Sequence, residues 1–206
     1  MTTLIEERPK HHEGWEQPEV VKALHLHPFR RLVMREIVKS LKPTSLLEVG
    51  CGRADTYAAI QPSLPTLRYC GMDQSSAMLQ HAMARFPEVA FLRGDIEALP
   101  YPDRAWDVVI SEHVLEHLRH FTPGLNELLR VAGRVVLIGW FRQPGEAPTQ
   151  LMTIRDKVHR HWINKYNRDD VLRTISASGF RLSMIHELTR RHCVWQLERE
   201  VSHDAP

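Results

Sequence analysis

Short apolar runs alternate along the chain with longer segments in which apolar positions recur every three to four residues. The first pattern is typical of buried strands and the second of amphipathic helices. Helices are predicted over residues 18–26, 28–41, 54–60, 76–85, 122–131 and 167–178. Strands are predicted over residues 46–49, 67–72, 89–92, 106–110, 134–141, 180–188 and 193–197. Ser76 and Asn167 are expected to cap their helices.

Strands that alternate with helices indicate right-handed crossovers and a mostly parallel sheet, which is an α/β fold. The last two predicted strands are joined only by about residues 189–192. A connection this short permits only an antiparallel pair. Residues 142–166 show no regular pattern, and no linker or internal repeat divides the chain. We therefore expect residues 1–206 to form a single domain.

Composition narrows the class of protein. The hydrophobic share of 43% argues against disorder, and no apolar run approaches the length of a membrane span. The charged N-terminus does not resemble a secretion signal. Three cysteines without CxxC spacing indicate a reducing cytoplasm and no cysteine-based zinc site. A net charge of +2 does not argue for a nucleic-acid partner, and the 13 histidines fit metal binding, acid–base chemistry or polar surface.

A glycine turn joins the first predicted strand to the next helix. Gly50 and Gly52 allow a tight turn and a close approach of the backbone to a ligand. The turn lies at the carboxyl end of a parallel strand, where open α/β sheets bind ligands. The dinucleotide fingerprint G-x-G-x-x-G fails because its third glycine would fall at Asp55, and there is no phosphate-loop G-K-[ST]. The turn therefore fits a nucleoside-like ligand better than a pyrophosphate.

Carboxylates follow the next two predicted strands. Asp73 comes 21 residues after Gly52, where an acidic residue would accept hydrogen bonds from ribose hydroxyls. The alternative is an aspartate that only shapes the turn and caps a helix. Asp95 ends the third strand, where a carboxylate can accept from the exocyclic amine of adenine.

Four segments in this order resemble the motifs of class I S-adenosylmethionine-dependent methyltransferases, closest to the type 11 subgroup that includes quinone-biosynthesis enzymes. They are Glu48-Val49-Gly50-Cys51-Gly52, Gly71-Met72-Asp73, Gly94-Asp95-Ile96 and Trp106-Asp107-Val108-Val109-Ile110-Ser111. The resemblance covers about residues 46–180. It implies a Rossmann-like, doubly wound, seven-stranded sheet of order 3-2-1-4-5-7-6 with strand seven antiparallel. It also implies S-adenosylmethionine as cofactor and S-adenosylhomocysteine as product.

The same resemblance implies a set of cofactor-binding residues. Glu48 and Gly50 would flank the methionine end, Asp73 would hold the ribose, and Ser111 would lie under the sulfonium. Asp95 and Ile96 would hold the adenine. The full implied set is Glu48, Gly50, Cys51, Gly52, Asp73, Gln74, Met78, Asp95, Ile96 and Ser111. Two departures from the family pattern stand out: Ala54 replaces a frequent third glycine, and residues 131–134 are shorter than the usual K-P-G-G turn.

A histidine–glutamate segment follows the fourth predicted strand. If it is helical, His113, Glu116 and His117 share one face, and His120 joins them if the helix continues. The letters also match H-x-x-E-H, an inverted zinc-protease signature. Four interpretations stay open: a solvated helix face, a general base or substrate-orienting role, a divalent metal site in a methyltransferase, and a zinc hydrolase. The last would not need the nucleoside motifs. In related quinone-biosynthesis enzymes with metal ligands here, an acidic residue matches His113.

The predicted function is methyl transfer to a small molecule, most simply to oxygen. An acidic hydroxyl benefits from a base with a pKa near 7, so His117 is the first catalytic candidate and His113 the second. The alternatives are N- or C-methylation, or a cofactor-binding regulatory module without catalysis.

The candidate contacts to the methyl acceptor lie at the end of the fifth predicted strand and in the irregular segment after it. Residues 142–166 are basic and aromatic, and the family resemblance implies that they form part of a substrate lid. Such a lid would suit a planar or anionic molecule, and the alternative is a solvated loop. Residues 1–41 would form a helical cap. An RNA or DNA substrate is disfavoured because the basic residues lack an aromatic-spaced platform. The predicted acceptor contacts are Trp140, Phe141, His159 and Trp162.

Overall fold

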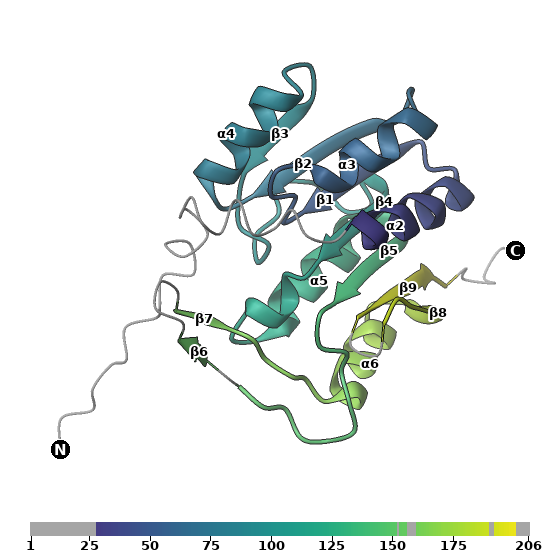
Figure 1. Ribbon diagram of the computed structural model, residues 1–206. Coiled ribbons are helices and arrows are strands. Elements are labelled where there is room, and N and C mark those ends of the chain that lie inside the picture. Colours follow the sequence, from purple (N-terminus) through teal and green to yellow (C-terminus); the bar gives the residue numbers. More distant parts are fainter. Residues whose placement is uncertain (1–27, 152, 156–159, 190–191, 201–206) are drawn as a thin grey trace, which may run out of the picture.

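The computed structural model describes residues 28–151, 153–155, 160–189 and 192–200, and within them one seven-stranded sheet dominates (Figure 1). The spatial order is β3-β2-β1-β4-β5-β9-β8, with β9 antiparallel to β5 and to β8. The expected order 3-2-1-4-5-7-6 with an antiparallel seventh strand is thereby confirmed. The strands are β1 Ser45–Val49, β2 Arg68–Asp73, β3 Ala90–Arg93, β4 Trp106–Glu112, β5 Ala132–Trp140, β8 Phe180–Glu187 and β9 Cys193–Arg199.

The helices begin and end close to their predicted bounds. They are α2 Pro28–Leu41, α3 Asp55–Ile60, α4 Ser76–Arg85, α5 Phe121–Val131 and α6 Arg168–Ala177, with short 3₁₀ turns η3 Gln61–Ser63 and η4 Leu115–His117. Asn167 caps α6 as predicted, accepting from the Asp170 amide. The cap of α4 is Ser75 rather than Ser76, because the Ser75 hydroxyl accepts from the Met78 amide. The helix expected over residues 18–26, and most of the predicted cap, lie outside the described residues.

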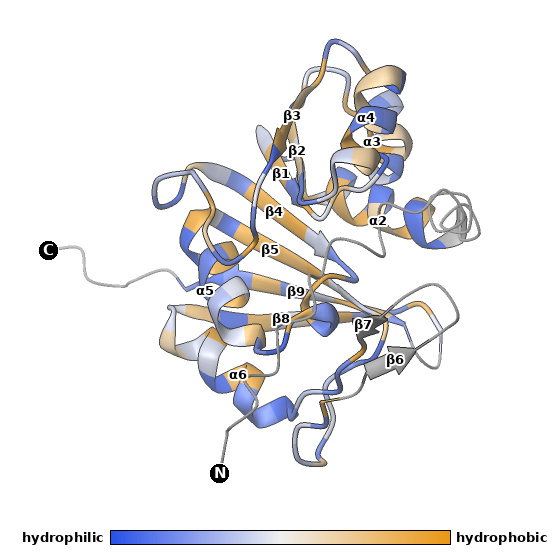
Figure 2. Ribbon diagram, turned by 90° about the vertical axis from the view of Figure 1, so that its left-hand side faces the viewer, coloured by the Kyte–Doolittle hydropathy of each residue, from blue (hydrophilic) through white to orange (hydrophobic). Residues whose placement is uncertain are grey.

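Both faces of the sheet are buried, which explains the nearly continuous apolar runs of its strands. Val109 packs into one core with α5 and α6, whereas Val108 and Ile110 pack into a second core with α2, α3 and α4. Figure 2 shows these two helix layers on either side of apolar central strands. Alternate residues of each strand therefore serve different cores.

A correction concerns residues 142–166, which were predicted to be irregular. Two short strands, β6 Thr153–Arg155 and β7 Arg160–Trp162, pair antiparallel as a separate ribbon. Each strand has only three residues, with one apolar residue in each, so no alternation of apolar positions marks them in the sequence. The role of this segment as a lid stays a prediction. In the part of the chain with described helices, none is long and apolar enough to cross a membrane.

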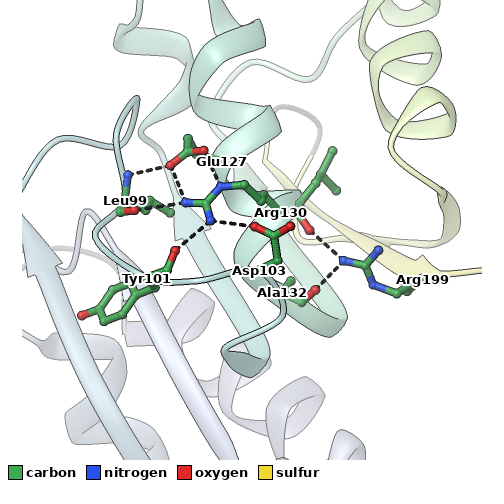
Figure 3. A network of polar contacts seen from close by, with 8 residues as sticks. Leu99, Tyr101, Asp103, Glu127, Arg130, Ala132 and Arg199 are labelled. Atoms are coloured by element: carbon green, nitrogen blue, oxygen red, sulfur yellow. Dashed lines mark hydrogen bonds and ion pairs between the residues drawn. The ribbon is translucent and has the colours of Figure 1, made fainter.

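An arginine at the end of α5 fixes the loop between β3 and β4 (Figure 3). The Arg130 guanidinium pairs with both oxygens of Glu127, at 2.6 and 2.8 Å, and with Asp103 at 3.0 Å. It also donates to the carbonyls of Leu99 and Tyr101. A planar, five-donor group can serve this many acceptors at once.

A second arginine closes the junction between α5 and β5, where the helix ends at Val131 and the strand begins at the next residue. Arg199 of β9 donates to the carbonyls of Leu129, Ala132 and Gly133, at 3.0, 2.7 and 3.1 Å. The last carbonyls of a helix lack partners within the helix, so these bonds supply them. The short segment at residues 131–134 therefore needs no separate glycine-rich turn.

Replacing Arg199 by Met is expected to lower the free energy of unfolding by about 2 kcal/mol, because part-buried carbonyls lose a charged donor. Urea denaturation measures the change. Arg181→Met is the matched control, since it removes only an exposed pair with Glu198 and should change stability by less than about 0.5 kcal/mol. Equal effects of the two variants would contradict a capping role for Arg199.

Candidate functional site

The turn after β1 places three residues in the left-handed region, at φ 80° for Gly50, 53° for Gly52 and 58° for Ala54. At Gly50 a Cβ would lie 2.2 Å from Cγ2 of Val114, so no side chain fits there. At Gly52 a Cβ would meet no atom of the described residues within 4 Å. The first glycine is therefore needed for packing inside the protein, whereas the second leaves an open side that a ligand can approach.

Ala54 explains the frequent glycine at its position in the family motif. Its left-handed backbone is the conformation that glycine adopts without cost. The alanine methyl is fully buried in the core shared with α2 and α3. Burial of the methyl offsets part of the backbone strain.

Asp73 ties the end of β2 to the turn. Its Oδ2 accepts from the amide of Gly52 at 2.8 Å, and its Oδ1 accepts from the amide of Ser75 at 2.9 Å. The amides of Gly50 and Cys51 donate to the carbonyl of Met72 at 2.7 and 3.0 Å. Asp73 thus shapes the turn, as its alternative interpretation required. A carboxylate has about four acceptor positions, so its predicted ribose role is compatible with these bonds.

The other predicted cofactor residues near α4 differ in exposure. Gln74 is half-buried, and its carbonyl accepts from Arg93 at 3.1 Å. Met78 and Cys51 are buried. Both side chains therefore belong to the buried core.

The predicted cofactor residues after β3 and at the end of β4 also differ in exposure. Asp95 is exposed and accepts from the amide of Glu97, whereas Ile96 is buried in the core. Ser111 is 1% exposed at the carboxyl end of β4, and its hydroxyl has no hydrogen-bond partner among the described residues. Buried hydroxyls normally have a partner, so Ser111 is a position where a bound ligand or water would complete the bonding.

Glu48 lies beneath the turn. It is 3% exposed and accepts from the Tyr69 hydroxyl at 2.6 Å. Burial raises the pKa of its carboxyl to about 8, although hydrogen bonds from Tyr69 and Thr56 act in the opposite direction. Its predicted place beside the methionine end stays a prediction, since its carboxyl already has two hydroxyl partners.

The helical condition, under which His113, Glu116 and His117 would share one face, is not met. Strand β4 continues to Glu112, and His113 has a φ of 57°, which interrupts any helix. Only the 3₁₀ turn η4 follows, and His120 precedes α5 as its N-cap residue. His117 ends η4 and is half-buried.

Glu116 holds backbone rather than metal. Its Oε1 accepts from the amide of Phe141 and, at 3.3 Å, from that of Arg142. Its own carbonyl accepts from the amide of Asn164 at 2.8 Å. Burial raises the pKa of its carboxyl to about 7. Within the described ranges, no group of three His, Cys, Asp or Glu side chains is arranged to hold a metal ion.

Three rings gather beyond the ends of β4, β5 and β9, and we call His113, Phe141 and His192 the aromatic corner. Their centroids lie 5.1 to 5.9 Å apart. The guanidinium of Arg30, on α2, lies 2.6 Å from Nδ1 and 2.7 Å from Nε2 of His113, so it can donate to whichever nitrogen lacks a proton. Arg30 also lies 3.8 Å from Glu112. Phe141 is exposed, as its predicted acceptor role requires.

The sequence alone missed Arg30 and His192. The predicted strand order could have indicated His192, because the turn between the last two strands lies beside the end of β5. Arg30 has no local signal, since it reaches His113 across 83 residues.

Trp140 does not face an open site, which corrects the prediction. Its indole is fully buried and packs on Trp195 and Tyr166, with ring centroids 5.7 and 6.5 Å away. Successive residues of a strand point to opposite faces, and Trp140 points into the core beneath α5 and α6. His159 lies outside the described residues. Trp162 is on β7, and its side chain is also outside them.

Comparison with known proteins finds similarity to methyltransferases. Residues 46–136 match the family model described as a methyltransferase domain. A probable S-adenosylmethionine-dependent methyltransferase of Mycolicibacterium smegmatis is 33% identical over 105 residues, which are 50% of this chain and 40% of that protein. Demethylmenaquinone methyltransferase of Thermotoga maritima is 28% identical over 106 residues, 50% of this chain and 46% of that protein. The matches thus span less than half the length of these relatives.

A solved structure shares the fold over more of the chain. It is the 1,6-didemethyltoxoflavin-N1-methyltransferase of Burkholderia thailandensis, crystallised with its substrate and S-adenosylhomocysteine. The TM-score is 0.67 at 13% identity, covering 87% of this chain and 82% of that one. At this identity the likeness concerns the fold alone.

The buried carboxyls predict how stability depends on pH. Glu48 and Glu116 have raised pKa values in the folded chain, about 8 and about 7, whereas unfolded glutamates titrate near 4.5. The folded state therefore binds more protons over this range, and the free energy of unfolding is expected to fall as pH rises from about 5 to about 8. Glu116→Gln should reduce this fall by an amount on the order of 1 kcal/mol.

Urea denaturation at a series of pH values measures the slope. Glu36→Gln, on the exposed side of α2, is the control and should leave the slope unchanged. A Glu116→Gln slope equal to that of the wild type would show that Glu116 is already ionised in the fold.

Proposed function

We propose that this chain, which carries a class I S-adenosylmethionine-dependent methyltransferase domain, binds S-adenosylmethionine at the turn after β1 and methylates a small molecule. The proposal rests on two features that fall in the same segment. Residues 46–136 match the methyltransferase family model. The turn after β1, with its open side at Gly52, lies within these residues. The relative from Thermotoga maritima agrees with the type 11 subgroup.

The residues at the turn fit this cofactor. Among the described residues, no side chain blocks the approach to Gly52, and the buried hydroxyl of Ser111 has no partner. Asp73 offers carboxylate lone pairs to hydroxyl groups. Asp95, exposed after β3, is in the position expected for an adenine amine. The set is polar where a nucleoside is polar.

The protein's part in the chemistry is alignment and proton removal. When bound, S-adenosylmethionine supplies a methyl group already activated by its sulfonium. The protein then has to hold the acceptor atom in line with that methyl and to take its proton where the acceptor is an acidic hydroxyl. A histidine has a suitable pKa for this step. We assign O-methylation as the reaction, with His117 as the base and His113 as the other candidate.

The aromatic corner supports a planar acceptor. Phe141 presents an exposed ring, and His113 and His192 border it. A flat acceptor can pack on these rings, while Arg30 beside His113 favours a negatively charged or hydroxyl-bearing edge. The fold places this corner at the same edge of the sheet as the turn after β1.

Calorimetry with S-adenosylhomocysteine tests the cofactor assignment. The wild type should bind, and Asp73→Ala should weaken binding by at least about 100-fold, because two charge-assisted hydrogen bonds are lost. Asp169→Ala, exposed on α6, is the control and should bind like the wild type. Absence of wild-type binding, or undiminished binding by Asp73→Ala, would remove the cofactor assignment.

Methyl transfer from labelled S-adenosylmethionine to a panel of phenols, amines and carbon acids tests the catalytic assignment. His117→Ala should leave S-adenosylhomocysteine affinity unchanged and slow turnover of a phenol by roughly 100-fold or more. His113→Ala is the paired variant. Loss of turnover in His113→Ala alone would move the base to His113.

Two further results of this assay would contradict the assignment. Transfer to an amine or a carbon acid alone would replace O-methylation by the corresponding alternative. Cofactor binding without transfer to any acceptor would favour a regulatory module.

A further inference from the structure

Asp55 joins the cofactor turn to two helices on the same side of the sheet. It is the first residue of α3 and its side chain is 13% exposed. Its Oδ2 accepts from Arg31 of α2 at 2.8 Å, and its Oδ1 accepts from Arg85 of α4 at 2.6 Å. Each carboxylate oxygen therefore holds an arginine from a different helix.

Arg85 also reaches the turn itself. The nitrogen that pairs with Asp55 donates to the carbonyl of Arg53 at 2.6 Å. On the other side of the turn, Asp73 accepts from the amide of Gly52. The segment between Gly50 and Asp55 is thus held from both sides, by β2 on one and by the two arginines on the other.

This support answers a conformational need. A non-glycine residue in the left-handed region is strained, and Ala54 occupies it directly before Asp55. Strained backbone persists only where the surrounding structure fixes it. Without Asp55, the turn would populate other conformations for which the open side at Gly52 is no longer formed.

We propose that Asp55 is a positioning residue for S-adenosylmethionine, which fixes the binding conformation of the turn through Arg31 and Arg85. The inference rests on the proposed function of the turn. Both oxygens of Asp55 are engaged by arginines, so it acts through the turn rather than by contact with the cofactor. In the sequence, the same residue only broke the dinucleotide fingerprint, and nothing there marked it as part of the site.

Asp55→Asn is the sharpest variant, because the amide has the size of the carboxylate but no charge, and it turns an N–H toward one of the two arginines. If the binding conformation falls to about a tenth of the population, the apparent dissociation constant for S-adenosylhomocysteine rises about tenfold. Calorimetry measures the constant. Asp170→Asn, which breaks the surface pair with Arg173 on α6, is the matched control and should bind like the wild type.

A merely structural role would have a different signature. The side chains of Arg31 and Arg85 are 21% and 34% exposed, so water can hydrate them when Asp55 loses its charge. The unfolding temperature of ligand-free Asp55→Asn should therefore stay within a few degrees of the wild type. A large fall in that temperature, with unchanged affinity of the folded protein, would overturn the proposal.

A mutant cycle tests the route through the arginines. The double variant Arg31→Met/Arg85→Met should weaken S-adenosylhomocysteine binding about as much as Asp55→Asn, and the triple variant no further. Additive losses would overturn the proposal by showing that Asp55 acts independently of these arginines. A wild type that fails to bind would refute the proposed function, whereas a binding wild type with an unaffected Asp55→Asn would refute only this inference.

Discussion

The contact between Gly50 and Val114 sets how closely the turn after β1 approaches the segment after β4 at the carboxyl ends of the parallel strands. The backbone of the turn after β1 approaches the Val114 side chain so closely that a Cβ on Gly50 would lie 2.2 Å from it. Val114 directly follows His113, so the turn that fits the cofactor and the segment that carries the candidate bases interlock at one point. Parallel strands bring their carboxyl ends to this edge, and the glycine lets the two segments close on each other. The distance between the turn after β1 and the segment after β4 is therefore set by packing inside the protein.

The start of α2 links the same two segments from outside the sheet. Arg30 contacts His113 and lies near Glu112, and the next residue, Arg31, pairs with Asp55. Neighbouring residues on a helix point about 100° apart, so one turn of helix can serve both places. A displacement of α2 would change the turn after β1 and the aromatic corner together. The turn after β1 and the aromatic corner thus share a common support in α2.

The sequence predicted the strands and the turn because these depend on periodicity and on residues close together in the chain, whereas the strand order was implied by the resemblance to the methyltransferase family. It failed where distant pairing decides the outcome. His113 leaves the helical region because β4 extends two residues further and its amide donates to the carbonyl of Gly139. Trp140 is buried because β9 places Trp195 against it. Arg30 contacts His113, which lies 83 residues further along the chain, and no local sequence pattern indicates this pairing.

The letters H-x-x-E-H show how backbone conformation decides the meaning of a motif. On a regular helix the three side chains would converge, and a metal would be a reasonable ligand. Here the left-handed His113 and the short turn η4 interrupt the helix. The Oε1 atom of Glu116 instead accepts hydrogen bonds from the amides of Phe141 and Arg142. That bond fixes the end of β5, from which Phe141 projects into the aromatic corner. The glutamate thereby gains a role that needs burial, and burial is also why its pKa rises to about 7.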